Sequence, residues 1–202
     1  EMVAECKELG ATKLIPDGPL PPGDIFSVGY DPSGERVCLF RIQVAALPGS
    51  GKFQLVGVTS KSIRESARMA FDYLRGNAKR ISLDRDFSSY DFNIQVMSPT
   101  QGRDTEDLGM AFFISILSAV LGRPMIAGLV VLGQMTIHGV LSRVENLADR
   151  LRVAMDAGAR QVMIPTANAP DFGSIPTDLL DKLRVEFFSD PAQAAFKALA
   201  DI

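Results

Sequence analysis

The sequence predicts a single α+β domain in which strands come first and helices then alternate with strands. Three observations predict this class. Extended runs separated by Pro- and Gly-containing turns fill residues 25–58. Residues 60–79 and 108–121 carry apolar side chains in helical patterns. From residue 129 onward short apolar runs alternate with amphipathic segments, and a chain of 202 residues can bury one sizeable core.

The first residues are expected to lie outside this core. Met2–Leu9 is predicted to be a short helix that ends at Gly10, and the run PDGPLPPG at 16–23 is rich in residues that break helices and strands. We therefore divide the chain into an N-terminal arm or linker, residues 1–24, and one domain, residues 25–202. The start has no signal-peptide pattern and no initiating Met, so we expect a fragment of a longer protein.

Three strands are predicted next. Ile25–Tyr30 and Arg36–Ala45 flank a DPSG turn and are expected to form a β-hairpin. A PGSG turn then leads into a third strand, Phe53–Val58. We expect all three strands to pair antiparallel.

A long helix is predicted from an N-cap at Ser60 to about Lys79. Its apolar residues recur at helical spacing and are Ile63, Ala67, Ala70, Phe71 and Leu74. Phe92–Met97 alternates in polarity and predicts a strand. Leu108–Leu121 is apolar nearly all round, which predicts a buried helix that is too short to span a bilayer.

The last third of the chain predicts short elements of both kinds. Gly158 is expected to end the first of its helices. The predicted strands are Leu129–Leu132, Met135–Ile137, Val162–Ile164 and Val185–Phe188, and the predicted helices are Glu145–Ala157, Pro176–Leu183 and Pro191–Leu199.

Composition and charge limit the classes of function. The net charge of −3 and a pI of about 5.2 do not indicate a broad nucleic-acid surface, although a local basic patch stays open. Cys6 and Cys38 are far apart and His138 is the single histidine, so no zinc motif is present. Two isolated cysteines agree with a reducing, cytoplasmic setting.

The run PGSGKF at 48–53 resembles a phosphate-binding P-loop but lacks two of its features. Ala46 stands where the first Gly is required, and Phe53 replaces the Ser or Thr that binds Mg²⁺. We therefore interpret the run as a hairpin turn, not a nucleotide site.

Acidic and basic residues offer three further candidates. Asp104, Glu106 and Asp107 precede the buried helix, where carboxylates favour the helix dipole and cap its first N–H groups; a Mg²⁺ site on Asp104 and Asp107 stays an alternative. His138 is expected to be a packed or surface residue and not a catalyst. The basic residues Arg143, Arg150 and Arg152 are expected on solvated faces or subunit contacts, with phosphate contact as the alternative.

Four stretches, in the same order and at matching spacing, resemble the proteolytic domain of Lon, an ATP-dependent protease. They are Ala46–Arg75 (ALPGSGKFQLVGVTSKSIRESARMAFDYLR), Tyr90–Val96 (YDFNIQV), Gly133–Gly139 (GQMTIHG) and Asp156–Asn168 (DAGARQVMIPTAN). The resemblance covers about residues 25–200. It implies the Lon proteolytic-domain fold, which is the ribosomal protein S5 domain 2-like fold.

The resemblance breaks at both catalytic positions. Lon's nucleophile loop reads P-K-D-G-P-S-A-G, and the matching run here is GRDTEDLG at 102–109, with Asp107 in place of the Ser. Lon's base motif reads G-G-L-K-E-K-L, and ENLADRL at 145–151 puts Ala148 in place of the Lys. The neighbouring loop residues are Arg103, Asp104, Thr105 and Glu106. Arg150 cannot substitute as the base because a guanidinium stays protonated.

The ending of the chain looks most like the Lon-like protein of BREX phage-defence systems. That group implies a domain without peptidase activity, with no catalytic residue, cofactor or metal of its own, that serves oligomerisation in a ring, expected to be a hexamer. ATP and Mg²⁺ are expected in a separate AAA+ ATPase domain of the same protein. DNA contact is expected through other domains, and no membrane contact is expected.

Two rival functions remain. The first is an active ATP-dependent endopeptidase with rewired residues, in which Ser98 or Thr105 is the nucleophile and Lys52 or another amine the base. The second is direct DNA binding by this domain, against which the acidic pI counts.

Overall fold

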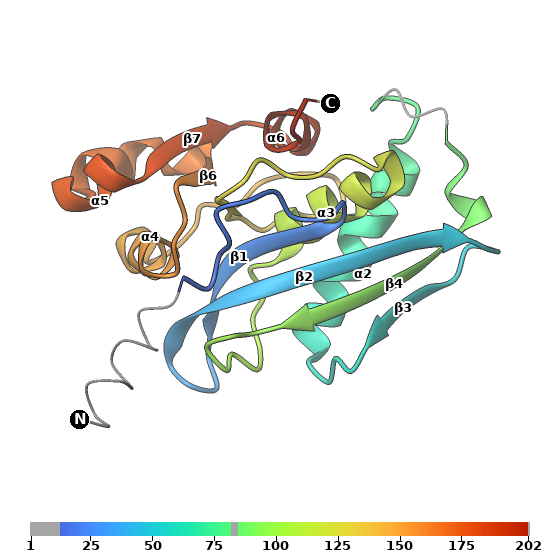
Figure 1. The fold of residues 1–202 in the computed structure, drawn as a ribbon, viewed down its shortest axis with the longest axis horizontal. Helices are drawn as coiled ribbons and strands as arrows, with labels where there is room; N and C mark the ends of the chain where they lie inside the picture. Colours follow the sequence, from blue (N-terminus) through green and yellow to red (C-terminus); the bar gives the residue numbers. More distant parts are fainter. Residues whose placement is uncertain (1–12, 82–84, 202) are drawn as a thin grey trace.

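The structure is a computed structural model that describes residues 13–81 and 85–201. Within these residues, seven strands form one mixed sheet in the order β3-β4-β2-β1-β5-β6-β7 (Figure 1). The structure is therefore an α+β domain, as predicted. The strands are β1 (Asp24–Asp31), β2 (Arg36–Pro48), β3 (Phe53–Val56), β4 (Tyr90–Met97), β5 (Leu129–Val131), β6 (Gln161–Pro165) and β7 (Arg184–Phe188).

The first half of the sheet corrects one prediction. β1 and β2 form the expected antiparallel hairpin, with Asp31 opposite Arg36. β3 does not continue it: β4 lies between β2 and β3, antiparallel to β2 and parallel to β3. The reason is burial of apolar side chains: β4 places Phe92 and Ile94 in the core. Pairing the long strand β2 with β4 therefore buries more apolar surface than pairing it with the four-residue β3 would. The turn at 48–53 is thus not a hairpin turn.

Helices cover both faces of the sheet. Successive residues of β1 point to opposite faces, so Ile25 packs in the core beneath α2 (Lys61–Gly76) and α3 (Gly109–Leu121). Phe26 packs in the second core beneath α4 (Leu147–Asp156). Figure 1 shows α2 and α3 behind the sheet. The remaining helices are α5 (Thr177–Lys182), α6 (Pro191–Ala198) and the 3-10 helices η1 (Phe87–Ser89) and η2 (Thr166–Ser174).

The two long helices form where they were predicted. Ser60 caps α2, because its hydroxyl accepts a hydrogen bond from the N–H of Ile63 at 3.1 Å. The helix ends at Gly76, earlier than expected, where the side chain of Asn77 donates to the carbonyl of Tyr73. All five predicted apolar positions of α2 are buried, and α3 is buried on nearly every side. None of the described helices is both long and apolar enough to cross a bilayer.

Residues 133–141 form a turn and not the predicted strand 135–137. A single antiparallel bridge joins Met135 to Leu141, and the segment between them is largely exposed. Gly139 has a φ of +76°, which reverses the chain before a strand can extend. In α4 the prediction that Gly158 ends the helix is confirmed, since its φ is +103° and its N–H donates to the carbonyl of Met155 at 3.0 Å.

The described part of the N-terminal segment lies against the domain. Ile15 is 1% exposed in the core beneath α4, and its N–H donates to the carbonyl of Ala157 at 2.9 Å. Gly23 is held by two buried hydroxyls of α3: Ser118 accepts its N–H at 2.9 Å, and Ser115 donates to its carbonyl at 2.6 Å. The predicted helix Met2–Leu9 lies outside the described residues.

Candidate functional site

The loop that joins β4 to α3, residues 98–108, lies beside the turn between β1 and β2. Ser98 donates to the carbonyl of Leu39 at 2.7 Å and accepts the N–H of Gly102 at 2.7 Å. Asp31, at the end of β1, accepts the N–H of Arg103 at 2.8 Å and that of Ser33 at 2.9 Å. These bonds fix the loop at the position that the Lon resemblance assigns to the nucleophile.

Asp31 is the most strongly perturbed acid of this region. Burial raises the pKa of its carboxyl, but the N–H groups of Arg103 and Ser33 and the Ser33 hydroxyl favour the charged form. Together these hydrogen bonds lower the pKa of Asp31 to about 2. The residue therefore stays ionised at neutral pH and anchors the loop. Its signal in the sequence was an Asp before P-S-G, where an aspartate side chain commonly bonds the backbone two residues on.

The centre of the site is an ion pair between Asp107 and Arg150. Arg150 Nη1 lies 2.9 Å from Asp107 Oδ2, with side chains that are 3% and 25% exposed respectively. The same carboxylate oxygen accepts the N–H of Tyr30 at 3.0 Å and faces the hydroxyl of Thr105 at 3.3 Å. Asp107, which the Lon resemblance places at the nucleophile position, thus already has a cation, a backbone amide and a hydroxyl as partners.

Arg150 is held from several sides. Its Nε donates to the carbonyl of Glu145 at 2.7 Å, and its Nη1 also donates to the carbonyl of Val28 at 3.3 Å. A buried guanidinium stays charged, so this position cannot accept a proton as a general base. Sequence reasoning assigned Arg150 to a solvated face or a subunit contact, and the structure corrects this. The signal was present, because Arg150 falls between Leu147 and Leu151 on the apolar stripe of α4.

Ala148, which the Lon resemblance places at the position of the base, is exposed in the first turn of α4. Residues two apart on a helix point in widely different directions, so Ala148 and Arg150 do not share a face. A cavity of about 270 Å³ lies beside Ala148 and is lined by Arg143, Glu145, Asp149 and Asp171, among others. No amine of residue 148 can reach this space, because a methyl group ends the side chain.

The other loop residues have structural partners. Thr105 is fully buried. Asp104 accepts a hydrogen bond from the Ser60 hydroxyl, which ties the loop to the start of α2. Glu106 is exposed, and its carbonyl accepts the Ser66 hydroxyl at 3.4 Å. The side chains of Asp104 and Asp107 thus have different partners.

The expected capping of α3 by these acids is wrong. The helix begins after Leu108 without a side-chain cap, and the N–H of Met110 instead donates to the carbonyl of Gly133 at 3.1 Å. The ion pair explains the difference, because Arg150 takes the Asp107 carboxylate away from the helix. Across residues 13–81 and 85–201, no three His, Cys, Asp or Glu side chains gather as a metal site.

The rewired dyad is not brought together. The N–H of Phe92 donates to the carbonyl of Lys52 at 2.7 Å, at the opposite end of β4 from Ser98. Since a strand rises about 3.3 Å per residue, the backbones of Lys52 and Ser98 lie roughly 20 Å apart. Thr105 lies near Ser98's end of the sheet, so it is also remote from Lys52.

The P-loop-like turn is filled by a protein carboxylate. Asp91 accepts the N–H groups of Ser50 at 2.8 Å and Lys52 at 2.9 Å, which are the groups that would bind a phosphate. The N–H of Lys52 is the first and largest cause of a lowered pKa at Asp91, followed by that of Ser50. The turn therefore does not fit a nucleotide.

The remaining candidates lie on the surface. His138 is exposed in the turn 133–141. Arg143 forms a bidentate ion pair with the carboxylate of Asp171. Arg152 Nη1 lies 3.4 Å from Asp178 Oδ2. These two ion pairs fasten neighbouring surface segments to each other.

Comparison with known proteins gives one family. A model of the Lon protease (S16) C-terminal proteolytic domain matches residues 23–201. The chain is 34% identical over 200 residues to a protein called Lon-like protease BrxL from Escherichia coli O9:H4 (strain HS), and 32% identical over 200 residues to one of the same name from Bacillus cereus (strain H3081.97). Both alignments cover 98% of this chain but 29% of the relative. Lon protease 1 of Syntrophobacter fumaroxidans (strain DSM 10017 / MPOB) is 30% identical over 159 residues, which are 78% of this chain and 20% of that protein.

Proposed function

Because the chain belongs to the Lon protease (S16) C-terminal proteolytic domain family, we propose that it is a Lon-type domain whose peptidase chemistry is lost and whose role is assembly. The chain spans 29% of the length of its BrxL relatives, so the activity of a whole protein is part of this proposal. The proposed whole is an ATP-dependent AAA+ ring, expected to be a hexamer, that acts in the cytoplasm and in phage defence.

The ion pair between Asp107 and Arg150 is the observation that carries the loss of chemistry. Ser–Lys catalysis needs a hydroxyl beside an amine that can take its proton. The matched positions hold a carboxylate and a methyl group, and the carboxylate lies 2.9 Å from a guanidinium that stays charged. An arrangement of this kind stabilises the fold at the old site without offering a nucleophile and a base.

An active peptidase with rewired residues has less support. Ser98 and Lys52 lie at opposite ends of β4, and the Thr105 hydroxyl is buried against Asp107. A nucleophile needs its base within hydrogen-bond reach, so neither pairing with Lys52 meets the geometric requirement.

The other parts of the proposal follow from the family. ATP and Mg²⁺ are proposed to bind a separate ATPase domain, since Asp91 fills the P-loop-like turn of this one. DNA is proposed to contact other domains, because this chain carries a net charge of −3. Removing the domain should therefore weaken ring assembly more than it weakens DNA affinity.

Peptide cleavage by the full-length protein tests the loss of chemistry. Casein and a fluorogenic peptide are incubated with wild type, Asp107→Ala and Ser98→Ala in the presence of ATP and Mg²⁺, with a Lon protease as the positive control. We expect no turnover above background in any of the three. Turnover above background in the wild type would contradict the proposal, and its loss in a variant that stays folded by circular dichroism would identify the nucleophile.

Assembly is tested on the same preparation by mass photometry. We expect oligomers in the full-length protein and a large loss of them when residues 25–202 are deleted. A full-length protein that stays monomeric at micromolar concentration would refute the assembly role, whatever the cleavage assay gives.

A further inference from the structure

We propose that two surfaces on opposite faces of this domain bind each other between neighbouring copies, in a head-to-tail contact. The first surface is the protruding turn, residues 136–140. The second is the sheet groove, formed by β2, β3, β4 and the segment Pro21–Gly23. The inference rests on the proposed assembly role and names the contact that would carry it.

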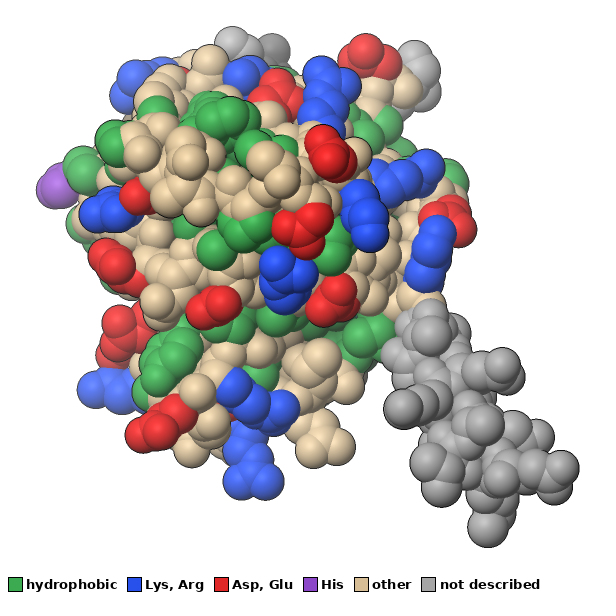
Figure 2. All heavy atoms as spheres, turned by 90° about the vertical axis from the view of Figure 1, so that its left-hand side faces the viewer, with side chains coloured by type: hydrophobic (Ala, Val, Ile, Leu, Met, Phe, Trp, Pro, Cys, Tyr) green, Lys and Arg blue, Asp and Glu red, His purple; other side chains and the backbone are tan. Residues whose placement is uncertain are grey.

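The protruding turn presents apolar side chains on a rigid backbone. Ile137 is 55% exposed and Val140 61% exposed, which is unusual for two large aliphatic residues so close in sequence. The N–H of Thr136 donates to the carbonyl of Val140 at 2.9 Å, and the N–H of Val140 donates to the Thr136 hydroxyl at 3.1 Å. Figure 2 shows the chain's one histidine, His138 of this turn, at the edge of the molecule.

The base of the turn is seated on α2. A Cβ atom on Gly139 would lie 2.5 Å from the ring of Tyr73, so the backbone packs directly against that side chain. Tyr73 is 8% exposed and belongs to the core beneath α2 and α3. The turn therefore projects from the face of the domain that these helices cover.

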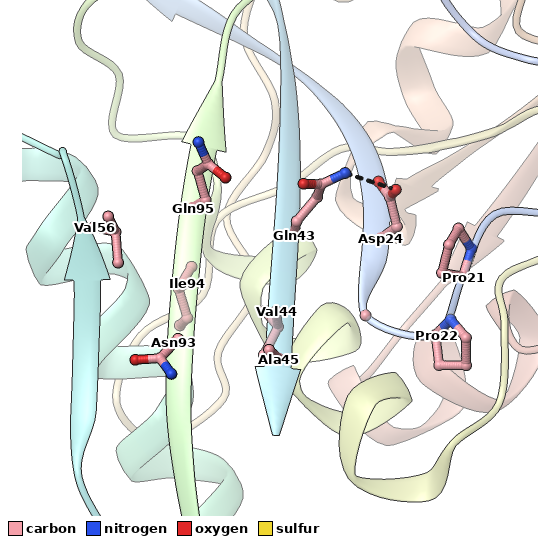
Figure 3. Close-up of a pocket in the computed structure, with 11 residues that line it drawn as sticks. Pro21, Pro22, Asp24, Gln43, Val44, Ala45, Val56, Asn93, Ile94 and Gln95 are labelled. Atoms are coloured by element: carbon pink, nitrogen blue, oxygen red, sulfur yellow. Dashed lines mark hydrogen bonds between the residues drawn. The ribbon is translucent and has the colours of Figure 1, made fainter. Parts of the chain in front are cut away.

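The sheet groove has a volume of about 450 Å³ and lies on the opposite face. Its strand residues alternate with core residues: Gln43 lies between Ile42 and Val44, which are buried beneath α2 and α3. The side chains that form its floor and rim are Gln43, Ala45, Val56, Asn93 and Gln95 (Figure 3). Because the strand separates the two faces, the turn of one chain cannot enter the groove of the same chain.

The far wall of the groove is also fixed. Pro21 and Pro22 stand across from Val56 in Figure 3, and Gly23 follows them. The two serines of α3 hold both backbone groups of Gly23, and the N–H of Val44 donates to its carbonyl at 2.9 Å. Binding to the groove thus requires little ordering of the chain, which favours affinity.

Neither surface carries an unpaired charge. The protruding turn, TIHGV, contains no Lys, Arg, Asp or Glu, whereas such residues make up 22% of the chain. Among the groove residues Asp24 alone is acidic or basic, and Arg41 neutralises it through bonds of 2.9 and 2.6 Å. The centres of protein interfaces are depleted of charged residues in the same way. A second copy is the occupant that supplies a turn with exposed Ile137 and Val140, and without Lys, Arg, Asp or Glu, to a groove whose one acidic side chain is already paired.

Opposite placement of the two surfaces determines the kind of assembly. A head-to-tail contact leaves one free turn and one free groove on every dimer, so it continues into a closed ring or a filament. A specific interface buries roughly 800 Å² per partner, so we place the turn and the groove at the centre of a larger contact.

Cysteine cross-linking in the full-length protein tests the contact. The double variant Val140→Cys/Val56→Cys and a second pair, Val140→Cys/Ala45→Cys, are treated with a short bismaleimide. The protein without these substitutions, treated in the same way, gives the background. We expect a ladder of covalent oligomers from the double variants and only a dimer from a mixture of the single variants Val140→Cys and Val56→Cys. The matched control is Phe196→Cys/Val56→Cys, since Phe196 is 48% exposed and lies on α6, which contributes no residue to either surface. It should give no ladder.

The outcomes separate this inference from the proposed function. Oligomers in mass photometry without a cross-link in either pair would overturn the contact and leave the assembly role standing. A dimer formed by Val140→Cys alone would mean a two-fold contact of turn with turn, which also overturns it. A Val140→Asp variant should raise the concentration for half-assembly at least tenfold relative to Phe196→Asp, and equal values for the two would count against the contact. Absence of any oligomer would overturn the inference together with the assembly role.

Discussion

Replacing Asp107 with Ala should destabilise the domain, because it leaves a buried cation without its counter-charge. Arg150 is 3% exposed and would keep only the carbonyls of Glu145 and Val28 as acceptors. The N–H of Tyr30 would lose its acceptor as well. Removing one member of a buried pair costs about 3–5 kcal/mol. Since the Asp107 side chain is 25% exposed, water can partly replace it. We therefore expect the free energy of unfolding to fall by about 2–3 kcal/mol.

The companion variants separate charge from packing. Arg150→Met keeps most of the side-chain volume and leaves Asp107 in contact with water, so we expect a loss of about 1–2 kcal/mol. The double variant Asp107→Ala/Arg150→Met has no uncompensated charge and should be close to Arg150→Met alone. The double-mutant cycle should then give a coupling energy of about 2–3 kcal/mol, which equals the loss expected for Asp107→Ala.

Urea unfolding followed by circular dichroism at equilibrium measures these free energies. The chain has no Trp and three Tyr, so intrinsic fluorescence would be a weaker probe. Arg152→Met is the matched control, because Arg152 is 48% exposed and lies 3.4 Å from an exposed carboxylate. A surface pair contributes little, so we expect a change within about 0.5 kcal/mol.

Two results would refute the reasoning. A loss below about 1 kcal/mol in Asp107→Ala would mean that Arg150 does not depend on Asp107 for its counter-charge. Additive losses in the double variant would mean that the two residues act independently. In either case the proposal that the ion pair replaced a catalytic pair would lose its support.

Two further predictions concern the loop anchor and the groove wall. Asp31→Asn should lower the free energy of unfolding at neutral pH by an amount on the order of 2 kcal/mol. It should also reduce the fall in this free energy as the pH is lowered. Because the pKa of Asp31 is depressed, its contribution to the stability of the wild type is complete above the ordinary value of 3.8 and is lost as the pH falls toward about 2. A difference in unfolding free energy between the two proteins that stays constant from pH 6 to pH 2 would contradict this. Gly23→Ala should cost about 2–3 kcal/mol, because Gly23 has a φ of +86° and a Cβ would lie 2.2 Å from the carbonyl oxygen of Val44. Gly76→Ala meets nothing within 4 Å and should be neutral or stabilising, so equal melting temperatures for the two variants would exclude this steric account.

Local patterns predicted the elements that depend on local interactions. The stripe from Ile63 to Leu74 and the cap at Ser60 predicted α2, because helical spacing and capping need only neighbours in the sequence. The apolar run 108–121 predicted α3 as a buried helix for the same reason. The strand 135–137 was wrong, since a positive φ at Gly139 reverses the chain within a few residues.

Pairing between distant segments could not be predicted in the same way. The turn at 48–53 gives the same local pattern whether β3 pairs with β2 or lies across β4, and the apolar side chains of β4 decide between them. The three acids before α3 were equally ambiguous, because a capping role and an ion pair both suit a carboxylate at residue 107. The buried guanidinium of Arg150 decides that question.

The sequence alone determined which residues the resemblance to Lon places at the Ser and Lys positions, because the order of residues along the chain assigns Asp107 and Ala148 to them. It also determined the α+β class, through periodicities that report which side of each segment is buried. Only the tertiary structure decided the partner of Asp107, because Asp107 and Arg150 are far apart in the chain and meet at 2.9 Å once α4 packs on β1 and β2. It likewise decided that the turn at 136–140 and the groove beside Gly23 face opposite ways, since the direction of a surface depends on the packing of the whole sheet.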